Sequence, residues 1–153
     1  MEPIKLINVA PDNSDLAGLI RNLDQYLAEL FPADEIFLID FNDPSIDKTF
    51  FVVAYLSDRP VGCGAIRPLN EKEVELKRFY VEPAYRRNGI ANQILAYLEN
   101  KARGLNFKAI RLETGDKQTE AIHFYKKHGY DEIDRFGEYI DCQSSRCFEK
   151  KFD

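Results

Sequence analysis

Two arginines and a glycine stand immediately before a helical pattern, in the stretch EPAYRRNGIANQIL that runs from residue 82 to residue 95. The first turn of a helix carries backbone N–H groups without intrahelical partners, and the helix dipole adds partial positive charge there. Gly89 leaves room for a ligand near the backbone, and Arg86 and Arg87 supply cationic donors. The pattern is typical of a loop that binds a phosphate-like anion. An ordinary helix start with solvated arginines fits this short stretch equally well.

The usual nucleotide-binding motifs are absent from the sequence. No glycine-rich loop ends in Gly-Lys-Ser or Gly-Lys-Thr, which excludes a P-loop. The pair Gly62 and Gly64 lacks the third glycine of a dinucleotide-binding fingerprint, because Arg67 stands at that position. This pair also falls within an expected strand that follows a hairpin, not before a helix. Both nucleotide-binding interpretations are therefore rejected.

The hydrophobic pattern predicts a mixed α/β order of elements that would position this loop between a strand and a helix. A run of antiparallel strands leads into a βαβα unit, which requires a parallel pair near the centre of the sheet. The expected strands are residues 4–9, 50–56, 61–69, 74–81, 109–113, 130–135 and 145–152. The expected helices are residues 16–30, 33–39, 89–103 and 119–128, and the segment FNDPSID is expected to be a loop.

Composition places the chain among globular proteins. Its 153 residues are enough for one domain, 1–153, and hydrophobic residues make up 44% of them. The net charge of −5 argues against a nucleic-acid or anionic membrane partner. No apolar run is long enough to span a bilayer, and the N-terminal stretch lacks a signal-peptide pattern. Three cysteines without metal or redox spacing favour free thiols and a cytoplasmic protein, with a Cys142–Cys147 pair as the alternative.

Two motifs in order resemble those of the GCN5-related N-acetyltransferase (GNAT) family. The stretch ELKRFYVEPAYRRNGIANQIL is similar to the family's central motif, Q/R-x-x-G-x-G/A, with Ala91 at its last small position. The stretch LETGDKQTEAIHFYKKHGY is similar to the next motif, a strand followed by a helix with A-x-x-F-Y. The ending SSRCFEKKF resembles the last strand of some small bacterial members. The expected order of elements matches the family along nearly the whole chain.

The resemblance implies acetyl-CoA as the acyl donor and no metal. The pyrophosphate would contact backbone N–H groups of the stretch Arg87 to Ala91. The pantetheine arm would run beside the strand that ends at Val81, in a gap where the two parallel strands splay apart. The residues that the resemblance assigns to the cofactor are Phe79, Tyr80, Val81, Arg86, Arg87, Asn88, Gly89, Ile90, Ala91 and Gln118. Lys77 and Arg78 either guide the phosphates or are exposed charges.

Acetyl transfer to an amine needs a base for the amine and an acid for the departing thiolate. The resemblance assigns the acid to Tyr125, which otherwise would be a packing residue of an amphipathic helix. Glu75 is the expected base, acting through water, because a glutamate has this relative position in histone-modifying members of the family. Glu113, on the adjacent strand, is the alternative base, and a solvent-facing Glu75 is the structural alternative.

The sequence therefore predicts an enzyme that moves acetyl from acetyl-CoA to a primary amine of a small molecule or peptide by direct attack. The alternative is a non-catalytic acetyl-CoA-binding sensor or interaction module. Many family members form dimers, so a homodimer is also possible. Nine carboxylates in the expected acceptor segments fit either a cationic acceptor or a solvated surface: Asp24, Glu29, Asp34, Glu35, Asp40, Asp43, Asp47, Glu138 and Asp141.

Overall fold

A computed structural model describes residues 3–152, so that the ends of the expected domain, residues 1–2 and 153, lie outside the described part of the chain. Seven strands form one sheet in the order β1-β2-β3-β4-β5-β7-β6. The strands are β1 (Ile4–Val9), β2 (Phe50–Leu56), β3 (Arg59–Pro68), β4 (Glu73–Val81), β5 (Ala109–Gly115), β6 (Asp131–Ile133) and β7 (Ser145–Lys151). The helices are α1 (Ser14–Leu30), α2 (Ile90–Gly104) and α3 (Thr119–Lys127). The predicted mixed α/β fold is confirmed.

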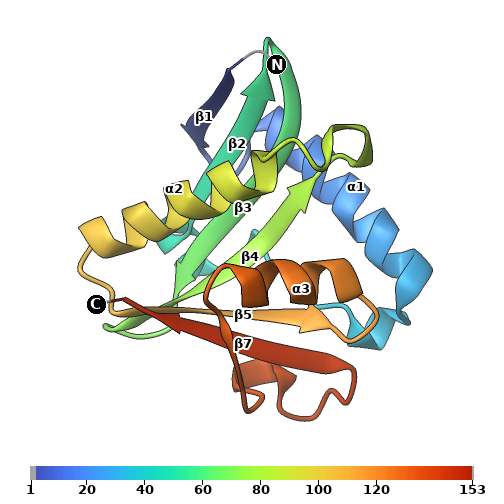
Figure 1. Cartoon of the computed structure of the whole chain (residues 1–153), viewed down its shortest axis with the longest axis vertical. Coiled ribbons are helices and arrows are strands. Elements are labelled where there is room, and N and C mark those ends of the chain that lie inside the picture. The colour runs from blue at the N-terminus through green and yellow to red at the C-terminus, as the bar shows by residue number, and fades with distance from the viewer. Residues whose placement is uncertain (1–2, 153) are drawn as a thin grey trace.

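The central strands β4 and β5 are parallel, as the order of elements predicted, and they pair over a short distance only. Their register joins Glu73 with Ala109, Val74 with Ile110 and Glu75 with Arg111. Beyond these pairs the two strands diverge, which Figure 1 shows as β4 rising away from the nearly horizontal β5. The other neighbours in the sheet are antiparallel. The sheet therefore has a wedge-shaped opening between its two central strands.

Helices cover both faces of the sheet and create two apolar cores. Figure 1 shows α2 and α3 lying across one face. Their core cluster includes Ile94, Leu98 and Tyr125. The helix α1 packs on the opposite face through the stripe Leu16, Leu19, Ile20 and Leu23. Burial of such stripes is the main force that holds helices to a sheet. The Asn13 side chain caps α1 by accepting a hydrogen bond from the Leu16 N–H.

One expected helix is wrong and one expected loop is more regular than predicted. Residues 33–39 contain a single 3-10 turn, η1 (Ala33–Glu35), after which Ile36 is extended and residues 37–39 have no regular secondary structure. The carbonyl of Phe37 accepts from Arg78 and its ring packs edge-on against Tyr139, so that tertiary contacts replace helical ones. The segment FNDPSID contains η2 (Pro44–Lys48), which Asp43 caps through the Ser45 N–H.

Gly62 and Gly64 of β3 are close-approach positions for α2. A Cβ atom at Gly62 would lie 2.9 Å from both the Ile94 side chain and the Tyr80 carbonyl oxygen, and one at Gly64 would lie 2.9 Å from Leu98. Their packing explains this glycine pair without a nucleotide. Within residues 3–152, no helix is both long and apolar enough to cross a membrane. The three cysteines are free thiols, as expected.

Replacing Gly62 with alanine is expected to lower the free energy of unfolding by about 1–3 kcal/mol, because the new methyl group meets a backbone oxygen that cannot move aside. The matched control is Gly18→Ala on α1, where a Cβ atom meets nothing within 4 Å. That change should raise the free energy of unfolding by about 0.5–1 kcal/mol. Urea denaturation measures both values. A Gly62→Ala protein as stable as the parent would contradict the close contact of Gly62 with the Tyr80 carbonyl oxygen and with α2.

Candidate active site

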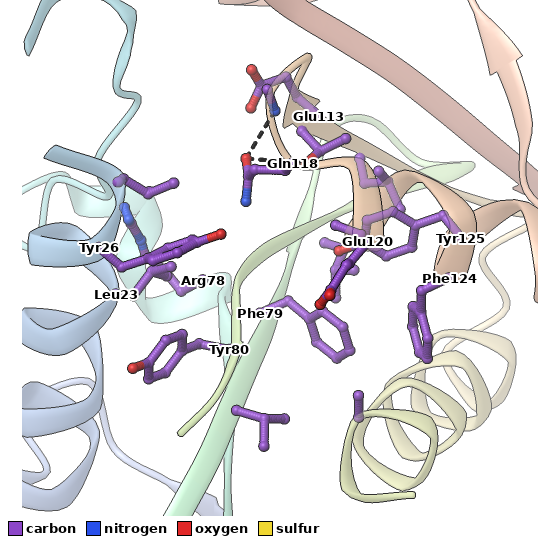
Figure 2. Close-up of a pocket in the computed structure, with 18 of the residues that line it drawn as sticks. Leu23, Tyr26, Arg78, Phe79, Tyr80, Glu113, Gln118, Glu120, Phe124 and Tyr125 are labelled. Carbon is purple, nitrogen blue, oxygen red and sulfur yellow. Dashed lines mark hydrogen bonds between the residues drawn. The ribbon is translucent and has the colours of Figure 1, made fainter. Parts of the chain in front are cut away.

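A cavity of about 990 Å³ occupies the opening between β4 and β5 and reaches both faces of the sheet. Figure 2 shows Leu23 and Tyr26 of α1 on one side of β4 and Phe124 and Tyr125 of α3 on the other. The cavity continues to the N-terminus of α2, where Gly89, Ile90 and Ala91 line it. A ligand can therefore extend from a helix N-terminus into the sheet and be reached from the opposite face.

A β-bulge at Arg78 shapes the wall of the cavity on β4. Cys63 faces Tyr80 whereas Ala65 faces Lys77, so β4 has one more residue than β3 between these pairs. Arg78 takes a φ of +52°, which is uncommon for a residue other than glycine. The bulge brings both Lys77 and Tyr80 to the α1 face and leaves Phe79 on the face of α3, where its ring stacks on Phe124.

The loop before α2 has an open backbone, as the sequence predicted for an anion-binding turn. Gly89 is the N-cap with φ of +78°, and a Cβ atom there would meet nothing within 4 Å. Within residues 3–152, none of the backbone N–H groups from Arg87 to Ala91 donates a hydrogen bond to the protein. These donors adjoin the cavity, so they fit a phosphate group by the physics of helix N-termini.

The two arginines of this loop differ in their contacts. Arg86 donates from Nε to the carbonyl of Val81 at 2.8 Å, and its guanidinium lies 5.6 Å from the ring centroids of Tyr26 and Tyr80. Arg86 thus ties the loop to the end of β4 and to α1. Arg87 has an 89% exposed side chain, with a long ion pair of 3.8 Å to Glu120. Arg87 is therefore the arginine that is free to reach an anion.

Ten of the twelve predicted site residues line the cavity: Phe79, Tyr80, Val81, Arg86, Arg87, Gly89, Ile90, Ala91, Gln118 and Tyr125. Asn88 is not among the lining residues, and its amide donates to the Tyr85 carbonyl instead. Gln118 accepts hydrogen bonds from Thr114 Oγ1 and the Gly115 N–H, which closes the turn between β5 and α3. Its amide nitrogen points into the opening (Figure 2).

Tyr125 is 6% exposed and lines the cavity from the face of α3. Its ring packs against Phe79, Phe124 and Tyr130. Its hydroxyl has no hydrogen-bond partner in the described part of the chain. Burial, and secondarily the charge of Glu113, raise the pKa of the phenol. The phenol of Tyr125 is therefore protonated at ordinary pH.

The two candidate bases occupy different environments. Glu75 is 1% exposed and is not among the residues that line the cavity. Its carboxylate accepts from Arg67 at 2.7 Å and, through a short hydrogen bond, from the Tyr139 hydroxyl. Glu113 does line the cavity and accepts from Ser145 Oγ at 2.6 Å. Burial raises the pKa of Glu113, and the Ser145 hydrogen bond and the Lys77 charge offset only part of that effect.

Three residues of the site were placed wrongly or missed from sequence. Lys77 and Arg78 are buried on β4 and not exposed, and Arg78 faces α1, where it forms an ion pair with Asp24. Tyr139, of η4 (Gly137–Tyr139), joins them because its hydroxyl accepts from Lys77 Nζ at 3.0 Å. No local pattern marks Tyr139, since its role depends on a contact between residues 62 positions apart.

A splayed parallel pair, a helix N-terminus with open N–H groups and a cavity that joins both faces fit an extended ligand that carries a phosphate group. The acetyltransferase (GNAT) family matches residues 16–130 of the chain. The chain belongs to this family and is an acetyl-transferring enzyme.

Individual relatives support the same assignment. The chain is 34% identical over 140 residues to an IAA acetyltransferase of Azospirillum brasilense, covering 91% of this chain and 92% of that protein. A solved structure of a candidate acyl-CoA N-acyltransferase from Klebsiella pneumoniae has a TM-score of 0.85 and 30% identity, covering 97% of each chain. A GNAT acetyltransferase of Elizabethkingia anophelis with acetyl-CoA bound has a TM-score of 0.72 at 17% identity, covering 99% of this chain and 100% of that chain.

Proposed function

We propose that this protein transfers acetyl from acetyl-CoA to a primary amine by direct attack, without a covalent enzyme intermediate. The observation that carries the proposal is the cavity that runs from the open N–H groups before α2 into the gap between β4 and β5. The fold neighbour from Elizabethkingia anophelis has acetyl-CoA bound, which supports this donor. The backbone of Arg87 to Ala91 would hold the pyrophosphate, and Phe79 to Val81 would border the pantetheine arm.

The proposed base and the proposed acid lie on opposite faces of the sheet. Glu113 alternates along β5 with Leu112, which belongs to the core under α2 and α3, so Glu113 lies on the α1 face. Tyr125 approaches from the α3 face. An amine that enters from the α1 side therefore meets Glu113 first, and a thiolate that leaves on the α3 side meets Tyr125.

These residues can balance the protons of the reaction. Glu113 takes one proton from the acceptor ammonium, and the neutral nitrogen then forms the C–N bond with the acetyl carbon. The C–S bond breaks, and Tyr125 donates its phenolic proton to the sulfur. The second proton of the nitrogen restores the Tyr125 phenol through solvent, and the proton on Glu113 passes to water. The net products are an amide, CoA thiol and one proton.

Glu75 as the base stays a prediction from the family resemblance, and the geometry favours Glu113. The carboxylate of Glu75 already accepts from Arg67 and Tyr139. A buried carboxylate with these partners is suited to hold β3, β4 and η4 together. Glu113 has one hydroxyl partner and adjoins the cavity, which leaves an oxygen for a water or an amine.

The non-catalytic sensor considered from the sequence is disfavoured, because the matching family and the named relatives are acetyltransferases. Such a sensor would bind acetyl-CoA in the same cavity without transfer. Thermal unfolding with acetyl-CoA, CoA and ATP as separate ligands tests donor binding, since a ligand specific for the folded state raises the melting temperature. We expect a rise with acetyl-CoA and CoA but not with ATP. A rise without CoA thiol release over a broad amine panel would favour the sensor. No rise with either CoA species would refute both candidates.

Changing Tyr125 to phenylalanine is expected to lower kcat by about 10²–10⁴-fold, the range for loss of a general acid, with little change in acetyl-CoA affinity. The control is Tyr97→Phe, because Tyr97 stacks on Phe50 and does not line the cavity. Steady-state thiol release and the melting-temperature shift with CoA measure the two effects. A Tyr125→Phe enzyme with full kcat would remove this tyrosine from the mechanism.

The pH profile identifies the base. A base must be deprotonated to act, so kcat/KM of the parent should fall as pH falls below the raised pKa of Glu113. Glu113→Gln should lower kcat/KM by about 10²–10⁴-fold and abolish this acidic limb. The change in kcat/KM at higher pH, which arises from titration of the acceptor amine, should remain in this variant. Glu75→Gln is the reciprocal variant: if it abolishes the acidic limb and Glu113→Gln keeps it, Glu75 is the base.

A further inference from the structure

The part of the cavity on the α1 face is mainly apolar. Six side chains of α1 and the segment after it line this part: Leu23, Tyr26, Leu27, Phe31, Ile36 and Phe37. Of the nine carboxylates considered for a cationic acceptor, Glu35 alone lines the cavity, and its carboxylate already accepts a short hydrogen bond from Ser144. The wall therefore favours an acceptor with an apolar body over a polycation.

Two ionisable side chains interrupt this apolar wall without an ion-pair partner. Lys77 is 6% exposed and lines the cavity, and its ammonium donates to the Tyr139 hydroxyl at 3.0 Å. Glu113 lines the cavity from β5 and accepts from Ser145. Neither forms a salt bridge with any residue of the described part of the chain. One cation and one anion thus flank the gap, on its two opposite strands.

Neighbouring buried ions are paired, which sets Lys77 and Glu113 apart. Arg78 forms an ion pair of 2.7 Å with Asp24, and Glu75 forms one of 2.7 Å with Arg67. A charge removed from water is costly unless it is paired and hydrogen-bonded. An ammonium has three donors, and the structure gives that of Lys77 one protein acceptor. The remaining capacity of both residues suits a ligand that carries one charge of each sign.

We propose that the acceptor is an α-amino acid with an apolar side chain. Its carboxylate would pair with Lys77, its α-ammonium would face Glu113, and its side chain would occupy the wall formed by α1 and residues 31–37. This inference rests on the proposed acetyltransferase function and adds Lys77 as the residue that determines specificity. The transfer itself follows the proton balance given above, with the α-nitrogen forming the new C–N bond.

Matched pairs of acceptors test the role of the carboxylate. CoA thiol release is measured with leucine against 3-methylbutylamine, and with phenylalanine against 2-phenylethylamine, each pair differing by the carboxylate alone. We expect kcat/KM to be at least about tenfold higher for the amino acid, as for a charge-assisted contact to a buried group. Lysine and aspartate serve as acceptors with charged side chains and should react more slowly than leucine.

Variants of Lys77 test whether this residue causes the preference for acceptors with a carboxylate. Lys77→Met should raise KM for leucine and abolish the preference for leucine over 3-methylbutylamine. Lys77→Arg keeps the charge and should retain part of the preference. Comparing the two variants separates loss of the charge from a folding defect in the methionine variant. The control is Lys72→Gln, because Lys72 is exposed and lies outside the cavity.

Two outcomes would overturn the inference while acetyl transfer stands. The first is equal kcat/KM for each amino acid and its decarboxylated partner. The second is a Lys77→Met enzyme that loses both acceptors alike, which would make Lys77 structural. If no acceptor releases thiol, thermal unfolding with CoA plus leucine or 3-methylbutylamine decides: a shift specific to leucine supports the inference, and none refutes it. A failure of the acetyltransferase proposal can be told apart from these outcomes, because acetyl-CoA would then not raise the melting temperature.

Discussion

The short pairing of β4 with β5 is the constraint on which the site depends. Three residue pairs join these strands before they diverge, and unpaired backbone groups inside a protein are costly. The opening is tolerated because each strand is paired on its outer side, β4 with β3 and β5 with β7. The outer pairs hold both strands in the sheet where their inner edges are unpaired.

A connected set of polar groups fixes the narrow end of the wedge. Arg67 on β3, Glu75 on β4 and Tyr139 in η4 contact one another in series, and Lys77 donates to the same Tyr139 hydroxyl. Such networks stabilise a structure when every member is satisfied. Here the network ties a loop near the C-terminus to the middle of the sheet. The loop that contains Tyr139 is thereby positioned by the sheet itself.

Local patterns in the sequence predicted the elements well and the side-chain partners poorly. The stripe Ile94 to Leu98 on α2 and the glycine before it follow from spacing, so the helix and its open N-terminus could be predicted. The irregular chain after Ile36 could not be predicted, because Phe37 in this segment contacts Arg78 and Tyr139, which are distant in the sequence. The burial of Lys77 could not be predicted either, because its side chain contacts Tyr139, which lies 62 positions away in the sequence.

The edges of the sheet bear on how the protein behaves at high concentration. The strand β6 has three residues, of which Asp131 and Glu132 are exposed, and the opposite edge strand β1 has an exposed Lys5. An exposed strand edge is a template for pairing with another chain, and short length and charge oppose this. Glu132 also forms an ion pair of 2.7 Å with Arg146 of the neighbouring strand, which holds its side chain beside this edge. The short length and the charged side chains of β6 thus disfavour growth of the sheet into fibrils at that edge.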